Sequence, residues 1–108
     1  MNKKMNVQNM LSNNGNKVPN QFIIHDRENG LRYFQSYNSI IVKIETGPLH
    51  RTVYLDKYYY NYSRTTAKYR NIFLGENSKE IQDKINSGVY TLIDLNKGEW
   101  KNEYLWLW

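Results

Sequence analysis

The clearest pattern of apolar and polar positions predicts an amphipathic helix from Arg64 to Leu74. Aromatic and β-branched side chains recur there at the three- and four-residue spacing of one helical face. Ser63 suits the N-cap, and Gly75 suits the left-handed residue that follows the last turn. The predicted packing face consists of Tyr62, Thr65, Thr66, Tyr69, Ile72 and Phe73. The predicted exposed face consists of Arg64, Ala67, Lys68, Arg70 and Asn71.

Strand-like segments precede this helix and are separated by turn signals such as Asn29-Gly30. β-Branched and aromatic residues dominate the segments, as is typical of strands. Consecutive strands with short connections pair in an antiparallel manner, so the segments predict a meander. The predicted strands are Gln21–Asp26, Leu31–Tyr37, Ile40–Glu45 and His50–Leu55.

Shorter elements are predicted after the central helix. Ser78 suits a second N-cap, and Ile81 and Ile85 share one face of a short helix. Residues 89–95 then alternate between two sets of side chains, which favours a fifth strand or an extended edge.

The fold class that follows is α+β. A small antiparallel meander of four or five strands is packed by one central helix and one or two short helices, all within a single domain of residues 18–96. Residues 1–17 are interpreted as a short helix or a tail, because Val7, Met10 and Leu11 have the spacing of one helical face. Residues 97–108 form a separate aromatic tail.

All three tryptophans of the chain lie in that C-terminal tail. An exposed apolar cluster of this kind marks an interface or an aggregation hazard. We expect either an interface, including a homodimer formed through the tail, or a tail folded back over the sheet. The residues concerned are Trp100, Tyr104, Trp106 and Trp108.

Composition narrows the function classes. The chain has no cysteine, which excludes disulfides and thiolate metal sites, and two histidines are too few for a histidine-built metal site without carboxylate ligands. It has no apolar run of membrane-spanning length and no signal peptide, so we expect a cytoplasmic protein, in the host cell, without a membrane partner. The net charge of +5 favours nucleic acid or an acidic protein surface as partner.

The sequence contains no catalytic signature. Its candidate acid–base residues, His25, His50, Asp56 and Glu76, show no characteristic spacing. A Gly-rich phosphate loop and paired metal ligands are also missing from the sequence. We therefore predict a non-enzymatic protein without a cofactor or metal, while distant residues can still converge in a fold.

The approach to the central helix is the strongest candidate for a binding surface. Tyrosines lie there beside cations, a combination that suits protein hot spots and also base stacking with phosphate contacts. The alternative is that the rings are core residues and the cations are simply solvated. The predicted binding residues are Tyr58, Tyr59, Tyr60, Arg64, Lys68, Arg70 and Asn71.

Four stretches carry a family resemblance: VPNQFII (18–24), YFQSYNSII (33–41), NYSRTTAKYRNIFLGE (61–76) and SGVYTLIDLN (87–96). In this order they resemble a family of small uncharacterised proteins encoded on phages, plasmids and mobile elements of low-GC Gram-positive bacteria. Tyr60-Asn61 stands where that family commonly has Trp-Asp, and the tail from Lys97 onward does not resemble it. The resemblance implies that the chain is an accessory protein of a phage or mobile element. Such proteins often inhibit host defence or act as regulators.

Two functions are predicted on these grounds. The first is a non-enzymatic binding protein of a phage or mobile element, an anti-CRISPR in the leading case. It would inhibit a host CRISPR–Cas nuclease complex by binding its protein or nucleic acid. The alternative is a basic nucleic-acid-binding accessory or regulatory protein without an enzyme target.

Overall fold

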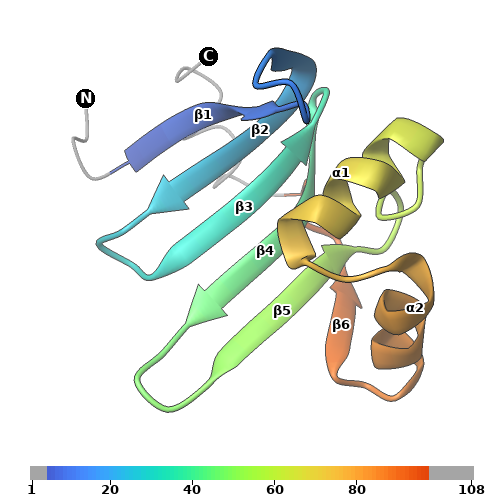
Figure 1. Cartoon of the computed structure of the whole chain (residues 1–108). Helices are drawn as coiled ribbons and strands as arrows, with labels where there is room; N and C mark the ends of the chain where they lie inside the picture. The colour runs from blue at the N-terminus through green and yellow to red at the C-terminus, as the bar shows by residue number, and fades with distance from the viewer. Residues whose placement is uncertain (1–4, 98–108) are drawn as a thin grey trace.

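The computed structural model describes residues 5–97. This part of the chain folds into a mixed β-sheet with two helices, which confirms the α+β class (Figure 1). Within these residues six strands lie in the sheet in the order of the sequence, which is more than the four or five predicted. They are β1 (Met5–Leu11), β2 (Lys17–Asp26), β3 (Leu31–Ser36), β4 (Ser39–Thr46), β5 (Arg51–Asp56) and β6 (Tyr90–Ile93). The helices are α1 (Arg64–Leu74) and α2 (Ser78–Asn86).

The N-terminal segment forms the first strand of the sheet, so the prediction of a short helix or a tail there was wrong. β1 pairs antiparallel with β2, and its register shifts between Asn9 and Leu11. Val7 and Met10 are three residues apart, so the ordinary alternation of a strand places them on opposite faces. Met10 lies in the helix-side core, and Val7 packs on the opposite face. Because both faces of this strand carry apolar residues, its three-residue apolar spacing imitated one face of a helix.

The last strand corrects the prediction of a wholly antiparallel meander. The pairs from β1 to β5 are antiparallel, but β6 lies parallel to β5. The connection between β5 and β6 contains both helices and returns the chain to the same end of the sheet. Parallel neighbours need a crossover of this kind, which a short turn cannot provide.

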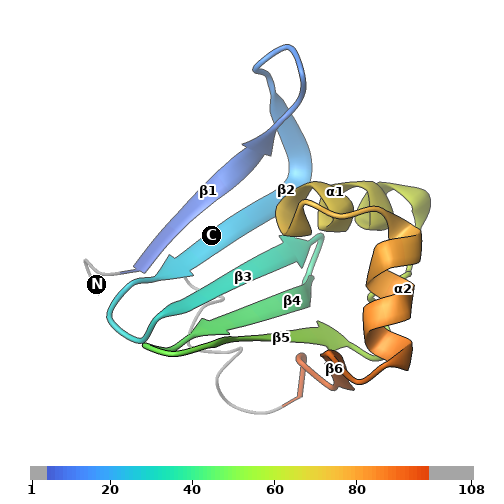
Figure 2. The ribbon, with the colours of Figure 1, turned by 60° about the horizontal axis from the view of Figure 1, so that its bottom comes forward.

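Each face of the sheet carries a row of paired residues that crosses several strands. The row on the helix side is Ile23, Phe34, Val42, Leu55 and Leu92. The row on the other side, which we call the second face, is Val7, Ile24, Tyr33, Lys43 and Tyr54. Both helices lie over the first row (Figures 1 and 2). The sheet thus separates two apolar surfaces.

Helix α1 has the predicted bounds because its capping residues work as expected. The Ser63 side chain accepts a hydrogen bond from the Thr66 N–H, and Gly75 follows the helix at a φ of 70°. The prediction that Tyr69 and Phe73 are core residues is confirmed, since both are buried.

The buried stripe of α1 is nevertheless rotated from the predicted face. Tyr62, Thr65 and Ile72 are exposed, although they were assigned to the packing side. Arg70 is buried, although it was assigned to solvent. The stripe consists of Thr66, Tyr69, Arg70, Phe73 and Leu74.

Helix α2 is capped by Asn77, one residue before the predicted Ser78. The Asn77 side chain accepts a hydrogen bond from the Glu80 N–H at 2.8 Å, and the Glu80 carboxylate accepts one from the Asn77 N–H at 2.9 Å. This reciprocal pair is a capping box. Neither described helix is long and apolar enough to cross a membrane.

Candidate functional site

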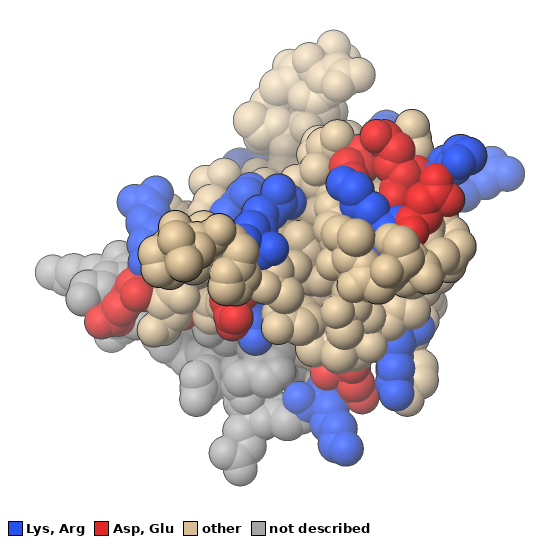
Figure 3. All heavy atoms as spheres, turned by 90° about the horizontal axis from the view of Figure 1, so that it is seen from below, with Lys and Arg blue, Asp and Glu red and all other residues tan. Residues whose placement is uncertain are grey.

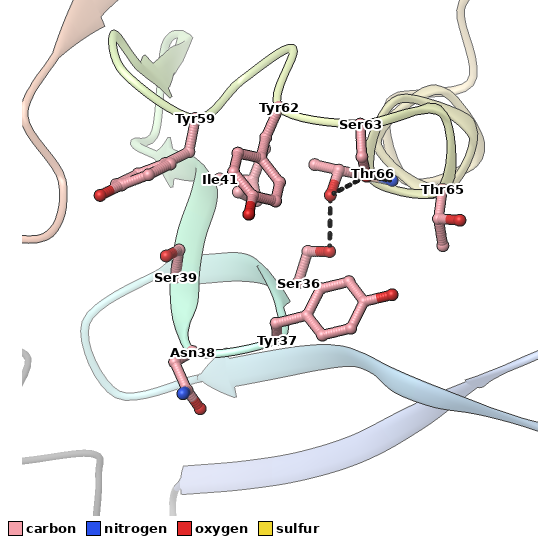
Figure 4. Close-up of a pocket in the computed structure, with 10 residues that line it drawn as sticks. All are labelled: Ser36, Tyr37, Asn38, Ser39, Ile41, Tyr59, Tyr62, Ser63, Thr65 and Thr66. Atoms are coloured by element: carbon pink, nitrogen blue, oxygen red, sulfur yellow. Dashed lines mark hydrogen bonds between the residues drawn. The ribbon is translucent and has the colours of Figure 1, made fainter.

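A hollow of about 590 Å³ lies where the β3–β4 turn meets the first turn of α1 (Figure 4). We call it the tyrosine pocket. It is built by the β3–β4 hairpin, by the loop that follows β5 and by the start of α1. Its lining residues are Ser36, Tyr37, Asn38, Ser39, Ile41, Tyr59, Tyr62, Ser63, Thr65 and Thr66, and all of them are uncharged.

Hydroxyl groups form the centre of the pocket. The Ser36 and Thr66 hydroxyl oxygens lie 2.9 Å apart, and the Ser63 hydroxyl donates to the Thr66 oxygen at 3.1 Å. The Ser63 oxygen also accepts a hydrogen bond from the Thr66 N–H. Ser36 and Thr66 are both buried. These bonds tie α1 to the end of β3, so the centre of the pocket is a fixed polar surface.

Tyrosine rings form one wall. The Tyr59 and Tyr62 ring centroids lie 5.8 Å apart at an interplanar angle of 70°, and Tyr58 meets Tyr59 at 6.5 Å and 64°. Edge-to-face contacts of this kind are favourable for aromatic rings. Tyr58 and Tyr62 remain 63% and 67% exposed, so most of their surface is open to a ligand.

Tyr37 stands on the other side of the Ser36–Thr66 hydrogen bond (Figure 4). It lies in the two-residue turn between β3 and β4 at a φ of 56°, the left-handed region. Its N–H donates to the Asn20 carbonyl, and its carbonyl accepts from the Gln35 amide, each at 2.7 Å. This conformation costs a non-glycine residue about 1–2 kcal/mol. Strain of this kind collects at functional positions, which favours a role for the half-exposed ring.

The loop that carries the tyrosines is held by Asp56, which is fully buried. One carboxylate oxygen accepts hydrogen bonds from the Tyr58 and Tyr59 N–H groups at 3.1 and 2.8 Å. The other accepts from the Leu95 N–H and the Asn96 amide at 2.8 and 3.0 Å. Asp56 therefore positions the loop and anchors the chain after β6.

The predicted binding residues are only partly brought together. Tyr59 lines the pocket, Tyr58 contacts it through the Tyr59 ring, and Arg64 is exposed on the first turn of α1. Lys68 is also exposed, but it lies near the β1–β2 turn with its ammonium 5.3 Å from the Tyr69 ring. Tyr60 packs partly against the helix-side core.

Arg70 and Asn71 belong to a hydrogen-bonded brace; the assignment of Arg70 to the exposed face was wrong, whereas Asn71 is half-buried. Arg70 is 2% exposed, and its guanidinium donates to the Tyr60 carbonyl at 2.6 Å and to the Asn71 side-chain oxygen at 2.9 and 3.1 Å. It also donates to the Ser78 hydroxyl at 3.2 Å. Burial lowers the pKa of Arg70, but arginine stays protonated in proteins. The brace joins the tyrosine loop, α1 and α2.

The candidate acid–base residues do not converge within the described part of the chain. Glu76 accepts hydrogen bonds from Lys84 and Tyr90, and Asp56 accepts hydrogen bonds from the backbone of the tyrosine loop. Burial, and then the charges of Arg32 and Arg27, lower the pKa of His25. Residues 5–97 contain no group of three or more acidic or histidine side chains able to hold a metal ion.

Sequence reasoning missed the hairpin side of the pocket. Tyr37, Ser36 and Ser39 are distant from the tyrosine loop in sequence, and only the fold brings them to it. The sequence signal that could have pointed to this side was Tyr37, a large ring in the short turn between two predicted strands. The predicted interface residues Trp100, Tyr104, Trp106 and Trp108 lie outside the described residues.

Charged groups are dispersed on the face shown in Figure 3. Lysine and arginine side chains lie there in small separate groups, interleaved with carboxylates, around a broad uncharged centre. The net charge of +5 is thus not gathered into one continuous basic surface on that side.

Family comparison covers most of the fold. No curated protein and no solved structure matches the chain. A family of unknown function, DUF8033, matches residues 5–87, which include β1 to β5, both helices and the entire tyrosine pocket. The chain therefore belongs to the DUF8033 family of unknown function.

Proposed function

We propose that this chain is a non-enzymatic binding protein and that the tyrosine pocket holds part of a partner protein. The observation that carries the proposal is an uncharged hollow in which exposed tyrosine rings surround fixed hydroxyl groups. Tyr, Ser and Asn are the residues that antibody loops use most, because they combine rigid contact area with adaptable hydrogen bonds. Tyrosine is also enriched among interface hot spots.

The rim of the pocket indicates the chemistry of the partner. Exposed Arg64 follows the pocket residue Ser63, and the Lys57 ammonium lies 5.0 Å from the Tyr58 ring. A partner segment with a ring or amide for the hollow and carboxylates for these two cations would complement the surface. A hollow of about 590 Å³ is within the size range of sites that enclose a ligand group.

The biological role is proposed from the family resemblance. A small binding protein of a phage or mobile element can inhibit a host nuclease by covering a working surface, and this requires no reaction. We therefore propose a guide-loaded CRISPR nuclease complex as the first partner to test.

Single-stranded nucleic acid is the second candidate. Its support is the row of contacting rings from Tyr58 to Tyr62 beside Lys57, since bases stack on aromatic rings while cations meet phosphates. With about three phosphates neutralised, the affinity would fall with salt at a log–log slope of about −2. The uncharged lining favours the protein partner instead.

The test uses co-elution in size-exclusion chromatography at low and moderate salt. The chain is mixed with guide-loaded nucleases, with the same nucleases without guide, and with guide RNA alone. We expect a salt-resistant complex with nuclease protein that is lost in Tyr59→Ser/Tyr62→Ser and kept in the exposed control Ile72→Ser. Binding to RNA alone with a steep salt dependence would support the second candidate. A complex that forms equally well with the pocket variant would overturn the assignment of the pocket.

A further inference from the structure

The second face of the sheet is buried although both helices pack on the opposite side. Ile24, Tyr33 and Ile40 are 0%, 3% and 2% exposed there, and Leu95 is 3% exposed. Half-buried apolar side chains surround these four: Met5, Val7, Leu31, Tyr54 and Ile93. Within residues 5–97 no helix covers this face (Figure 2). If this face were bare, its rings and aliphatic groups would be in water, at a free-energy cost proportional to their apolar area.

The described chain ends beside this face. Leu95 belongs to its buried cluster, and the Asn96 side chain both accepts from the Ile40 N–H at 2.7 Å and donates to the Ile40 carbonyl at 3.0 Å. This two-point contact fixes the chain to the start of β4. The residues that follow Lys97 therefore begin at the second face.

We propose that the C-terminal segment, residues 98–108, packs across the second face and closes a second core. Its length is sufficient, because eleven extended residues reach about 36 Å and five strand spacings span about 24 Å. Its pattern also fits, since an extended segment would turn alternate side chains to the sheet. The residues that share one side are Trp100, Tyr104, Trp106 and Trp108.

Charge also favours this segment over the N-terminal residues 1–4. That end carries Lys3 and Lys4, which would face Lys43 in the middle of the second face. The C-terminal segment carries Glu99, Lys101 and Glu103, and in the extended register these charged side chains would lie on the side turned away from the sheet. Its aromatic side would then meet Lys43, whose ammonium already lies 5.6 Å from the Tyr54 ring and is complemented by aromatic rings.

Docking of the tail is independent of the proposed function, because the tyrosine pocket is formed with α1 on the other side of the sheet. It assigns the tryptophans to the interior of this protein. They would then not be available to contact a partner or a second copy.

Tryptophan fluorescence tests the proposal directly, because all three tryptophans of the full-length chain lie in the segment. We expect blue-shifted emission and quenching by iodide that is several-fold weaker than in urea. Both should stay constant over a wide range of protein concentration. Emission as accessible as in urea would overturn the proposal. Protection that appears only as a dimer forms in sedimentation would also overturn it, in favour of a second copy.

Substitution in the full chain gives a second readout. Trp106→Ser/Trp108→Ser should lower the urea midpoint and increase the binding of an apolar dye. The matched control is Leu49→Ser/Val89→Ser, which removes two apolar side chains that are 94% and 62% exposed and should change neither value. Equal behaviour of the two double variants would contradict docking. Far-UV circular dichroism should show that both variants retain the fold.

Discussion

Two arginines on α1 show how residues of one type take different roles in this protein. Arg64 is exposed beside the tyrosine pocket, whereas Arg70 is buried among neutral hydrogen-bond acceptors. The sequence placed both on one exposed face, because a charged side chain is seldom buried. What it could not show is that a carbonyl, an amide and a hydroxyl converge on the Arg70 guanidinium.

Replacement of Arg70 therefore tests its structural role. We expect Arg70→Ala to lower the free energy of unfolding by about 3 kcal/mol, because several charge-assisted hydrogen bonds and a buried stem are lost. Arg70→Lys should retain little of this stabilisation, since an ammonium cannot reproduce the planar set of hydrogen-bond donors of a guanidinium. Arg64→Ala should stay within about 0.5 kcal/mol of the parent. Urea denaturation measures all three, and equal effects of the two alanine variants would refute the brace.

Tyr37 should behave in the opposite way. Tyr37→Gly removes the exposed ring and relieves a left-handed conformation, so the free energy of unfolding should be unchanged or raised by up to about 1 kcal/mol. Thermal denaturation measures this. A clear loss of stability would mean that the ring packs in the fold and is not held there for binding.

At the scale of elements, local signals decided which predictions were correct. The bounds of α1 follow from Ser63 and Gly75, which act within one helical turn. β1 was mistaken for a helix because both of its faces carry apolar residues, Val7 on one and Met10 on the other, and the need to cover both faces is a property of the whole sheet. The parallel placement of β6 depends on the crossover through both helices, which no short pattern encodes.

The contact of α1 with the sheet depends on Phe73. Its ring lies 5.9 Å from the Phe34 ring and 4.9 Å from the Arg32 guanidinium, and it is 9% exposed. Phe73→Ala should cost about 3–5 kcal/mol of unfolding free energy. Urea denaturation checks this value, with the exposed Ile72→Ala on the same helix as control. A loss no larger than that of the control would place Phe73 outside the core.

The link between α2 and β6 should make stability depend on pH. Burial by itself raises the pKa of Glu76, but hydrogen bonds from Lys84 and Tyr90 and the charges of Lys84 and Arg51 lower it overall. The stabilisation is therefore complete above the ordinary pKa of 4.5 and is lost as pH falls through the lowered value. Urea midpoints measured from pH 7 to pH 3 should decline less in Glu76→Gln. Parallel curves would show that Glu76 is not the group responsible.

At the scale of the whole molecule, the two faces of the sheet carry different features. Its helix side contains the larger core and, at one end, the tyrosine pocket, while its second face forms a smaller cluster. The tyrosine half of the pocket could be predicted only in part, since Tyr59 was among the predicted binding residues but Tyr62 was assigned to the packing face of the helix. The hairpin half could not, because the register of β3 and β4 brings Ser36, Tyr37 and Ser39 to it.

The pocket as a binding surface is the central claim, and the affinity of Tyr37→Gly for the partner identified by co-elution tests it most directly. Calorimetric titration of this variant against the parent separates binding from folding, because we expect the substitution to leave the fold at least as stable. A hot-spot ring is worth about 2 kcal/mol or more, so the affinity should fall by a factor of about 30 or more. An affinity equal to that of the parent, at equal stability, would contradict the account.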